Sequence, residues 1–485
     1  MALLTSLKFN NTFHKLGGSF YAEVRPRVLA NPYIVSANPE VADLIGLDET
    51  QLKSPEFLSL MAGEKVPLGC QPLAMVYSGH QFGHYNPRLG DGRGILLGQV
   101  DGSQAKWDLH LKGAGLTPFS RQGDGRAVLR SSIREYLCSE AMYGLGIPTT
   151  RGLAIAGSDS PVYRETLEHG ATLLRVAESH VRFGSFEYFY YTQQYDCVEQ
   201  LAEYVIANNF PHLLQQPKPF AALLSEVVAA TAKLIAQWQS VGFNHGVMNT
   251  DNMSILGHTF DYGPFAFLDD YEYGYICNHS DAEGRYAFSQ QPYIGLWNCH
   301  ALAQTFGKLV AEEELRDILA TYEPILLEHY WRLMRDKSGF IQAEETDQAF
   351  IGGLLGVMEN NKVDYTIFFR RLCDYKIDQK NTAIRDLFLD RSAADSWLAE
   401  YNLRLQREAS VDDDRAKRMR QCNPKYILRN YMLQNAITAA QNKNFSEVDL
   451  LLKLISNPFA EQPEYEDYAK HPPTWGKGLE ISCSS

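Results

Sequence analysis

The sequence has 485 residues, of which 45% are hydrophobic and 12% aromatic, enough for a large core in two or three domains or in one bilobal unit. The formal net charge of −13 argues against binding to nucleic acids or to anionic membranes, because both need a basic face. The start of the chain resembles no secretory signal, and the most apolar stretch, residues 220–238, contains charged residues typical of an amphipathic core helix. We therefore expect a cytoplasmic protein with no membrane-spanning helix.

Residues 1–70 are expected to form a mixed N-terminal extension with short helical pieces. Over residues 71–185, short apolar runs are bounded by Gly, Pro, Asp and Ser, which is typical of strands and turns. The runs 94–100 and 106–113 are separated by Asp-Gly-Ser-Gln-Ala and predict a hairpin. One long helix is predicted over 125–146. This part of the chain therefore predicts a small β-rich lobe.

The rest of the chain is mainly helical by its pattern. Residues 186–300 are expected to form the core of a second lobe, and residues 301–485 a helical C-terminal region. Helices are predicted over 301–336, 391–409 and 424–456. The expected fold class is α+β and bilobal, with a β-rich N-lobe, a larger helical C-lobe and helical extensions.

The segment FNHGVMNTDNMSILGHTFDYGPFAFLDDYE, residues 243–272, carries the most specific pattern. His245 and Asn252 have the spacing of the protein-kinase loop H-R-D-x-x-x-x-N, and Asp261 begins a D-Y-G triplet similar to D-F-G. In kinases that Asn and Asp bind magnesium, so Asn252 and Asp261 are candidate ligands for Mg²⁺ or Mn²⁺. Each motif alone is equally typical of a polar turn. Their joint spacing favours a nucleotide site.

Val247 stands where the kinase loop has its catalytic aspartate. A valine side chain cannot accept a hydrogen bond from a substrate hydroxyl. Asp251 is the nearby carboxylate that could replace the aspartate, and its different place in the loop would move the attacking hydroxyl along the phosphate chain. The alternative is a catalytically silent nucleotide-binding scaffold.

Lys112 ends a predicted strand and is a candidate phosphate contact of the kinase type, held by a carboxylate on the following helix. Glu135 and Glu140 compete for that pairing. We favour Glu135, because it lies at the flank of the predicted helix and Glu140 lies nearer its apolar face. For a strand lysine considered alone, a solvated side chain would be the better interpretation.

Gly-Asp-Gly-Arg occurs twice, at 90–93 and at 123–126. Glycine permits close approach of the backbone to phosphates, and the second copy is predicted to open a helix whose N-terminus attracts anions. Such tetrapeptides are also common hairpin turns. Arg175 and Arg182 are further candidate phosphate contacts, although surface salt bridges explain them equally well. His80 and His84 are expected to pack in a loop rather than bind a metal, since glycines flank them.

Taken together, these motifs resemble the selenoprotein O family. The resemblance rests on YSGHQFG, LGDGRGILLGQV, HLKGAGLTPFSRQGDGRAVLRSSIREYL, SDSPVYRE, the segment 243–272 and the terminal CSS, and it covers about residues 70–485. It implies a protein-kinase-like fold that binds ATP in an inverted orientation and transfers AMP to Ser, Thr or Tyr hydroxyls of proteins. The nucleotide contacts that it implies are Gly90, Gly92, Arg93, Lys112, Asp124, Gly125, Arg175 and Arg182.

The resemblance further implies that Asn252 and Asp261 are the metal ligands, Asp251 the proton acceptor and Glu135 the partner of Lys112. It also concerns the cysteines. The eight cysteines form no C-x-x-C pair, and Cys483, close to the C-terminus, is expected to be accessible and reactive. In the family this tail position is similar to one that pairs with a cysteine near the active site, here Cys277, as a redox switch.

The leading hypothesis is therefore a Mg²⁺- or Mn²⁺-dependent protein adenylyltransferase that uses ATP, modifies Ser, Thr or Tyr of protein substrates and is a monomer. The alternatives are the silent scaffold and uridylyl transfer from UTP.

Overall fold

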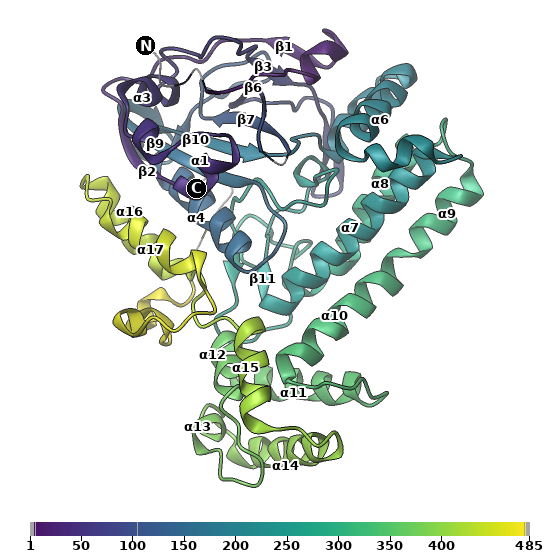
Figure 1. Ribbon diagram of the computed structural model, residues 1–485, viewed down its shortest axis with the longest axis vertical. Coiled ribbons are helices and arrows are strands. Elements are labelled where there is room, and N and C mark those ends of the chain that lie inside the picture. Colours follow the sequence, from purple (N-terminus) through teal and green to yellow (C-terminus); the bar gives the residue numbers. More distant parts are fainter. Residues whose placement is uncertain (1–3, 5, 104, 480, 482–485) are drawn as a thin grey trace.

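The computed structural model describes residues 4, 6–103, 105–479 and 481. Its N-terminal part is built on an antiparallel sheet with the strand order β1-β3-β6-β7-β10-β9-β2, in which β8 also pairs with β10 (Figure 1). The strands are β1 Tyr21–Glu23, β2 Tyr33–Ala37, β3 Leu73–Met75, β6 Gly94–Asp101, β7 Lys106–Lys112, β8 Ala127–Val128, β9 Arg151–Tyr163 and β10 Leu167–Ala177. A separate hairpin consists of β4 Gly79–Gln81 and β5 His84–Asn86.

Because side chains alternate in direction along each strand and most are apolar, both faces of this sheet are apolar. On β6, Ile95 and Leu97 pack with α1 Pro39–Leu44, α2 Glu49–Leu52 and α3 Pro55–Met61. Leu96 points to the opposite face, into the core shared with α4 Leu129–Gly144. Successive side chains of a strand leave opposite faces, so a continuous apolar run indicates a sheet covered on both sides.

The remaining chain is mainly helical. The first group contains α5 Phe183–Tyr191, α6 Tyr195–Asn209, α7 Pro219–Val241, α8 Gln291–Thr305, α9 Glu312–Ala320 and α10 Tyr322–Ser338, and the short strands β11 Phe243–Asn244 and β12 Ala266–Phe267 pair between α7 and α8. The lower part of Figure 1 contains α11 Asp347–Asn361, α12 Tyr365–Leu372, α13 Thr382–Arg385, α14 Arg391–Arg407 and α15 Asp412–Cys422. These helices form a second core together with Leu268, Tyr271, Phe288 and Met334. Finally, α16 Asn430–Gln441 and α17 Ser446–Ser456 return to pack against α4, and α17 also contacts β2.

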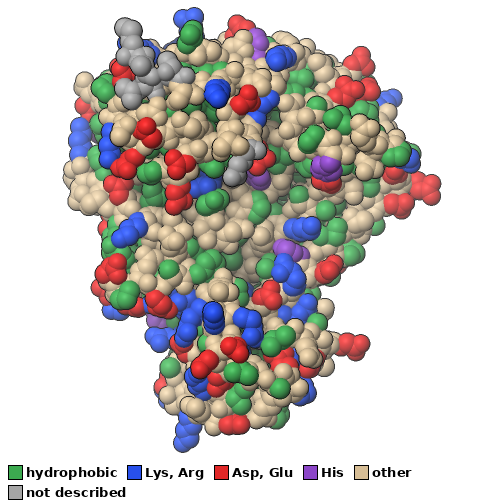
Figure 2. Space-filling view, in the orientation of Figure 1, with side chains coloured by type: hydrophobic (Ala, Val, Ile, Leu, Met, Phe, Trp, Pro, Cys, Tyr) green, Lys and Arg blue, Asp and Glu red, His purple; other side chains and the backbone are tan. Residues whose placement is uncertain are grey.

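The most apolar helix, α7, is long and apolar enough to cross a membrane by length and composition alone. Its side chains Leu223, Val227 and Ile235 are buried in the protein core, and it packs against α8, α9 and α10. The expected core helix is therefore what the structure contains, although its composition overlaps that of a membrane span. Over the face drawn in Figure 2, acidic and basic side chains are interspersed.

Several expectations from the sequence are confirmed and others change. The hairpin is confirmed as β6–β7, with Gly94 opposite Lys112. The helix predicted from residue 125 starts only at Leu129, because residues 127–128 pair with β10 as β8, so the second Gly-Asp-Gly-Arg does not open the helix. The helix predicted over 301–336 is divided among α8, α9 and α10, and that over 424–456 between α16 and α17.

The N-terminal 70 residues are more than an appendage in the structure. They supply β1 and β2 to the main sheet, at its two ends, in addition to the predicted helical pieces α1 to α3. Strands as short as these carry little periodic signal, so their pairing was not visible in the sequence.

Candidate active site

A cavity of about 530 Å³ lies where the sheet, α4 and the 243–272 segment meet. Its lining includes all the residues predicted to bind nucleotide or metal or to act as the base, namely Gly90, Gly92, Arg93, Lys112, Asp124, Gly125, Glu135, Arg175, Arg182, Asp251, Asn252 and Asp261. These residues come from segments as far apart as the loop before β6 and the loop before β12. The fold thus brings the predicted set to one place, while the contact that each makes with a ligand remains a prediction.

Lys112 at the end of β7 pairs with Glu135 on α4, as expected. Glu140 instead accepts hydrogen bonds from the Arg151 guanidinium, 2.7 Å away at the closest, and from Asn38. The reason given for preferring Glu135 is wrong, however, because Glu135 is only 3% exposed and does not lie on an open flank. Its second oxygen, Oε1, accepts from Arg175 Nη1 at 3.1 Å, so that two cations balance its buried charge.

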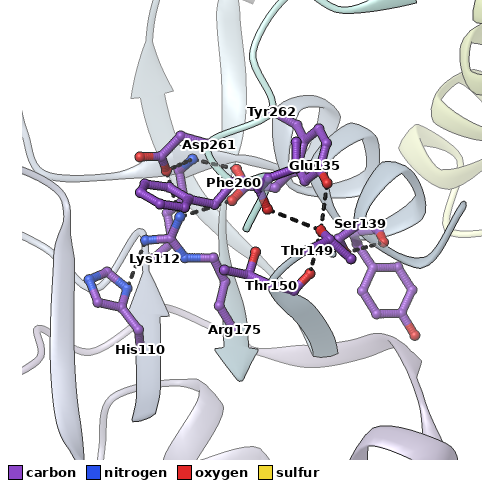
Figure 3. Close-up of polar contacts among 12 residues, drawn as sticks. His110, Lys112, Glu135, Ser139, Thr149, Thr150, Arg175, Phe260, Asp261 and Tyr262 are labelled. Carbon is purple, nitrogen blue, oxygen red and sulfur yellow. Dashed lines mark hydrogen bonds and ion pairs between the residues drawn. The ribbon is translucent and has the colours of Figure 1, made fainter. Parts of the chain in front are cut away.

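Asp261 is the point on which the cations converge (Figure 3). Its Oδ1 lies 2.5 Å from Arg175 Nη1 and 3.5 Å from Lys112 Nζ, and its Oδ2 accepts from Arg182. Burial alone would raise its pKa, but Arg182, Arg175 and Lys112 together hold the pKa of this carboxyl well below its usual range. Arg175 and Arg182 are both buried, so the alternative of two surface salt bridges is wrong.

Asp251 has a different electrostatic setting. It lies in the short 3₁₀ turn Thr250–Asn252, where Thr250 donates to the buried carboxylate of Glu187. Gln81 Nε2 donates to Asp251 Oδ2 at 3.3 Å, whereas Oδ1 is buried and has no hydrogen-bond partner among the described residues. Burial outweighs the effect of nearby Arg182 and raises the pKa of Asp251 to about 7. A carboxylate that titrates near neutrality and has an unpaired acceptor oxygen is suited to take a proton.

Asn252 and Asp261 provide an amide oxygen and an ionised carboxylate, the donor types that Mg²⁺ and Mn²⁺ accept. Asn252 Nδ2 donates to the main-chain carbonyl of Val247 at 3.0 Å, and within the described chain no donor reaches its Oδ1. Both side chains line the cavity, and the low pKa keeps Asp261 ionised. The residues present therefore fit a divalent cation, whose remaining ligands would be phosphate oxygens and water.

The two glycine-rich loops are shaped first by the protein itself. A Cβ on Gly90, whose φ is +100°, would lie 2.6 Å from the Phe119 ring, and one on Gly125, with φ +71°, would lie 2.2 Å from the carbonyl oxygen of Gly115. Asp124 pairs with Arg164, 2.8 Å away, and accepts from the backbone N–H of Arg126. These positions line the cavity, but packing between the loops already explains their residue types.

Comparison with known proteins then identifies the family. The family described as "Protein adenylyltransferase SelO" matches residues 3–456. The chain belongs to the SelO family. It is 54% identical to "Protein nucleotidyltransferase YdiU" of Myxococcus xanthus, and 53% and 52% identical to proteins of the same description from Pseudomonas fluorescens and Vibrio vulnificus, each over 100% of both chains.

For this SelO-family chain, the structure adds cavity residues that the sequence reasoning did not select. Gln81, Asp91, His110 and Arg164 all line the cavity. Gln81 lies inside the YSGHQFG motif, and Asp91 lies between two of the predicted phosphate-binding glycines. His110 and Arg164 had no local signal, because their partners are distant in sequence.

His80 and His84 belong to the β4–β5 hairpin rather than to an irregular loop. His80 Nδ1 lies 2.5 Å from Glu187 Oε1, and His84 is exposed. No group of three His, Cys, Asp or Glu side chains that could hold a metal occurs in the described part of the chain. The expected packing is therefore confirmed for His80 and wrong for His84, while the expectation that neither binds a metal stays a prediction.

The proposed redox pair is only partly visible. Cys277 is buried, with its Sγ near the carbonyl oxygens of Asn244 and Pro264 at 3.5 and 3.4 Å. Cys483 lies outside the described residues. The backbone N–H of His279 donates to the carbonyl of Ile481 at 2.9 Å, so Ile481 lies against the segment that follows Cys277. The pairing stays a prediction.

Proposed function

We propose that this protein is an adenylyltransferase that moves AMP from ATP to Ser, Thr or Tyr hydroxyls of other proteins. The observation that carries the proposal is the state of Asp251, a buried carboxyl with a pKa of about 7 and one oxygen that has no hydrogen-bond partner among the described residues, in the same cavity as Lys112, Arg175 and Arg182. A proton acceptor beside a cationic cradle for phosphates is the minimum that nucleotidyl transfer to a hydroxyl requires. Membership of the SelO family supports the same chemistry.

In this mechanism the carboxylate of Asp251 accepts the proton of the acceptor hydroxyl. The hydroxyl oxygen forms a bond to the α-phosphorus, the bond from that phosphorus to the bridging oxygen of the β-phosphate breaks, and pyrophosphate leaves. Lys112, Arg93, Arg175 and Arg182 hold the phosphates, and Glu135 and Asp261 keep three of these cations in place. Such preorganised charges stabilise the transition state without rearranging during the reaction.

A Mg²⁺ or Mn²⁺ ion would be held by Asn252 and Asp261 and would neutralise negative charge on the phosphates. Arg175, Arg182 and Lys112 act on Asp261 from the protein side and keep its carboxylate ionised for that task. The choice between the two metals does not follow from the donor atoms, since both prefer oxygen ligands.

The proposal extends to the architecture. Residues 71–185, which supply α4 and the strands β3 and β6 to β10, correspond to the N-lobe of a protein-kinase-like fold. Residues 186–300 correspond to the catalytic core of its C-lobe, with ATP bound in the inverted orientation. Support comes from the Lys112–Glu135 pair between a strand and the following helix, which is the kinase arrangement. Residues 301–485 would then be a helical addition. We also propose a monomeric, cytoplasmic protein.

The test uses ATP labelled at the α or at the γ position, offered with Mg²⁺ or Mn²⁺ and a mixture of cellular proteins. Label that reaches protein from the α position only, and that Asp251→Ala abolishes, supports adenylylation. Label from the γ position only would overturn it in favour of phosphorylation. A parallel arm with α-labelled UTP distinguishes uridylyl transfer, and ATP binding without any labelled product would support the silent scaffold.

A further inference from the structure

His110 on β7 is a buried side chain beneath the nucleotide cavity that the proposed mechanism does not use. Its Nδ1 lies 3.0 Å from Arg175 Nη2, and its Nε2 lies 3.2 Å from Asp91 Oδ2. Asp91 is the second residue of the first Gly-Asp-Gly-Arg. The imidazole therefore contacts both the first glycine-rich loop and a cation of the phosphate cradle.

The chemistry of the two partners determines how the ring is protonated. A guanidinium only donates hydrogen bonds, so Nδ1 of His110 must accept from Arg175. Nε2 then carries the hydrogen and donates to Asp91 Oδ2, which also accepts from the backbone N–H of Met75 at 3.0 Å. The ring is thus the neutral tautomer with a directed bond at each end.

Arg175 is the residue whose position this arrangement decides. Its Nη1 reaches Glu135 at 3.1 Å and Asp261 at 2.5 Å, while His110 takes the other terminal nitrogen (Figure 3). A guanidinium is planar, so contacts at both terminal nitrogens hold the plane and not merely the charge. Without His110, the described residues give Nη2 of Arg175 no acceptor.

The surrounding chain is shaped to accept this ring. A Cβ on Gly94, directly after the first Gly-Asp-Gly-Arg, would lie 2.2 Å from His110 Cε1, so the absence of a side chain there makes room for the imidazole. On another side the His180 ring stacks on it at a centroid distance of 4.7 Å and is itself held by Asp108. The glycine at 94 is thus explained by His110 rather than by a phosphate.

We propose that His110 is a positioning residue, which links the first glycine-rich loop through Asp91 to Arg175 and so sets the orientation of the phosphate cradle around Asp261. The inference rests on the proposed function in one respect, that Arg175 acts on bound nucleotide. Partners that orient the groups around a metal ligand typically contribute about 10- to 100-fold to affinity or activity.

Two substitutions of His110 distinguish the hydrogen bond at Nδ1 from that at Nε2. In His110→Asn the amide oxygen lies near the place of Nδ1 and can still accept from Arg175. In His110→Gln the amide nitrogen reaches the place of Nε2 and keeps only the bond to Asp91. We expect ATP affinity and kcat/KM for ATP to fall about 10- to 100-fold in His110→Gln and about threefold or less in His110→Asn. Both variants lose the ring, so their melting temperatures should fall alike.

His180→Asn is the matched control, since it removes the stacked ring but can still donate to Asp108 and has no contact with Arg175. Its ATP affinity should fall less than that of His110→Gln, because both hydrogen bonds of His110 remain. Arg175→Ala provides a second check, because His110→Gln should cost little further affinity in that background. Equal effects of His110→Asn and His110→Gln, or full additivity with Arg175→Ala, would overturn the inference.

ATP affinity is measured by calorimetry without turnover, so the inference and the proposed function can fail separately. A wild-type protein that binds ATP but transfers no AMP contradicts the proposed function. The comparison of the His110 variants still decides whether His110 positions Arg175. A wild-type protein that binds no ATP would overturn both.

Discussion

The side-chain nitrogen of Asn252 donates to the main-chain carbonyl of Val247, 3.0 Å away. The position that holds the catalytic aspartate in a kinase loop therefore contributes through its backbone here. Its bond fixes which end of the Asn252 amide is the nitrogen and leaves the oxygen to act as a ligand. The backbone of Val247 therefore helps to orient the Asn252 side chain in the proposed metal site, and its side chain plays no part in that contact.

Asn252→Ala removes that oxygen. We expect AMP transfer to fall about 100-fold or more, because the metal ion that this oxygen would hold beside the phosphates is bound less tightly. A higher concentration of Mg²⁺ or Mn²⁺ should be needed for the half-maximal rate. Metal titrations of the transfer rate measure both quantities, and the melting temperature controls for folding. An unchanged metal requirement would remove Asn252 from the ligand set.

The rate of AMP transfer should rise with pH through about 7. Asp251 must be ionised to accept a proton, and burial raises its pKa to about 7, so the base is lost as the pH falls below that value. A pH profile of kcat/KM checks this. A profile that is flat between pH 5.5 and 8.5 would contradict the role of Asp251 as the base.

The same raised pKa has a consequence for stability with the opposite trend. Between the unfolded value of 3.8 and about 7, the folded state binds the proton more tightly, so stability from this group is present at low pH and lost as the pH rises through about 7. The cost of a buried charged Asp251 at pH 8 is about 4 kcal/mol. Asp251→Asn should therefore raise the melting temperature by a few degrees at pH 8 and by less than half of that at pH 5. A gain of equal size at both pH values would show that the carboxyl is not held protonated.

Gln81→Leu should move the pH profile. Gln81 Nε2 donates to Asp251 Oδ2, and Asn86 Nδ2 donates to Gln81 Oε1 at 3.2 Å, which orients the carboxamide. Loss of a donor disfavours the charged form of Asp251, so the midpoint of the rate profile should shift to higher pH. Asn86→Leu, which leaves Gln81 in place, should shift it less.

Glu135→Gln and Glu140→Gln form a matched pair on one helix. Glu135 balances Lys112 and Arg175 in the cavity, whereas Glu140 balances buried Arg151 away from it. We expect Glu135→Gln to weaken ATP binding about tenfold. Glu140→Gln should leave ATP binding unchanged but destabilise the fold by about 3–5 kcal/mol, since it leaves a buried charge without its partner. Calorimetry and denaturation measure the two effects, and interchanged results would contradict the assignment of the partner to Lys112.

The sequence by itself determined the parts of this protein that depend on neighbours along the chain. The β6–β7 hairpin follows from two apolar runs around a turn, and the candidate ligands Asn252 and Asp261 follow from fixed spacing within one loop segment. Lys112 and Glu135 could be paired because a strand and the next helix are packed together in the motif that they resemble. A boundary error such as that at the start of α4 arose where pairing with β10 converted residues 127–128 into a strand.

Only the tertiary structure decided which side chains meet across the cavity. Arg175 lies 65 residues from His110 and 86 from Asp261, and no periodicity of either segment indicates that one guanidinium binds both. The pKa of Asp251 likewise depends on burial beneath the β4–β5 hairpin, whose Gln81 is 170 residues away. Side-chain direction and dielectric environment arise only once the sheet, α4 and the 243–272 segment pack together, and for that reason the electrostatics of the site could not be predicted from the order of the residues.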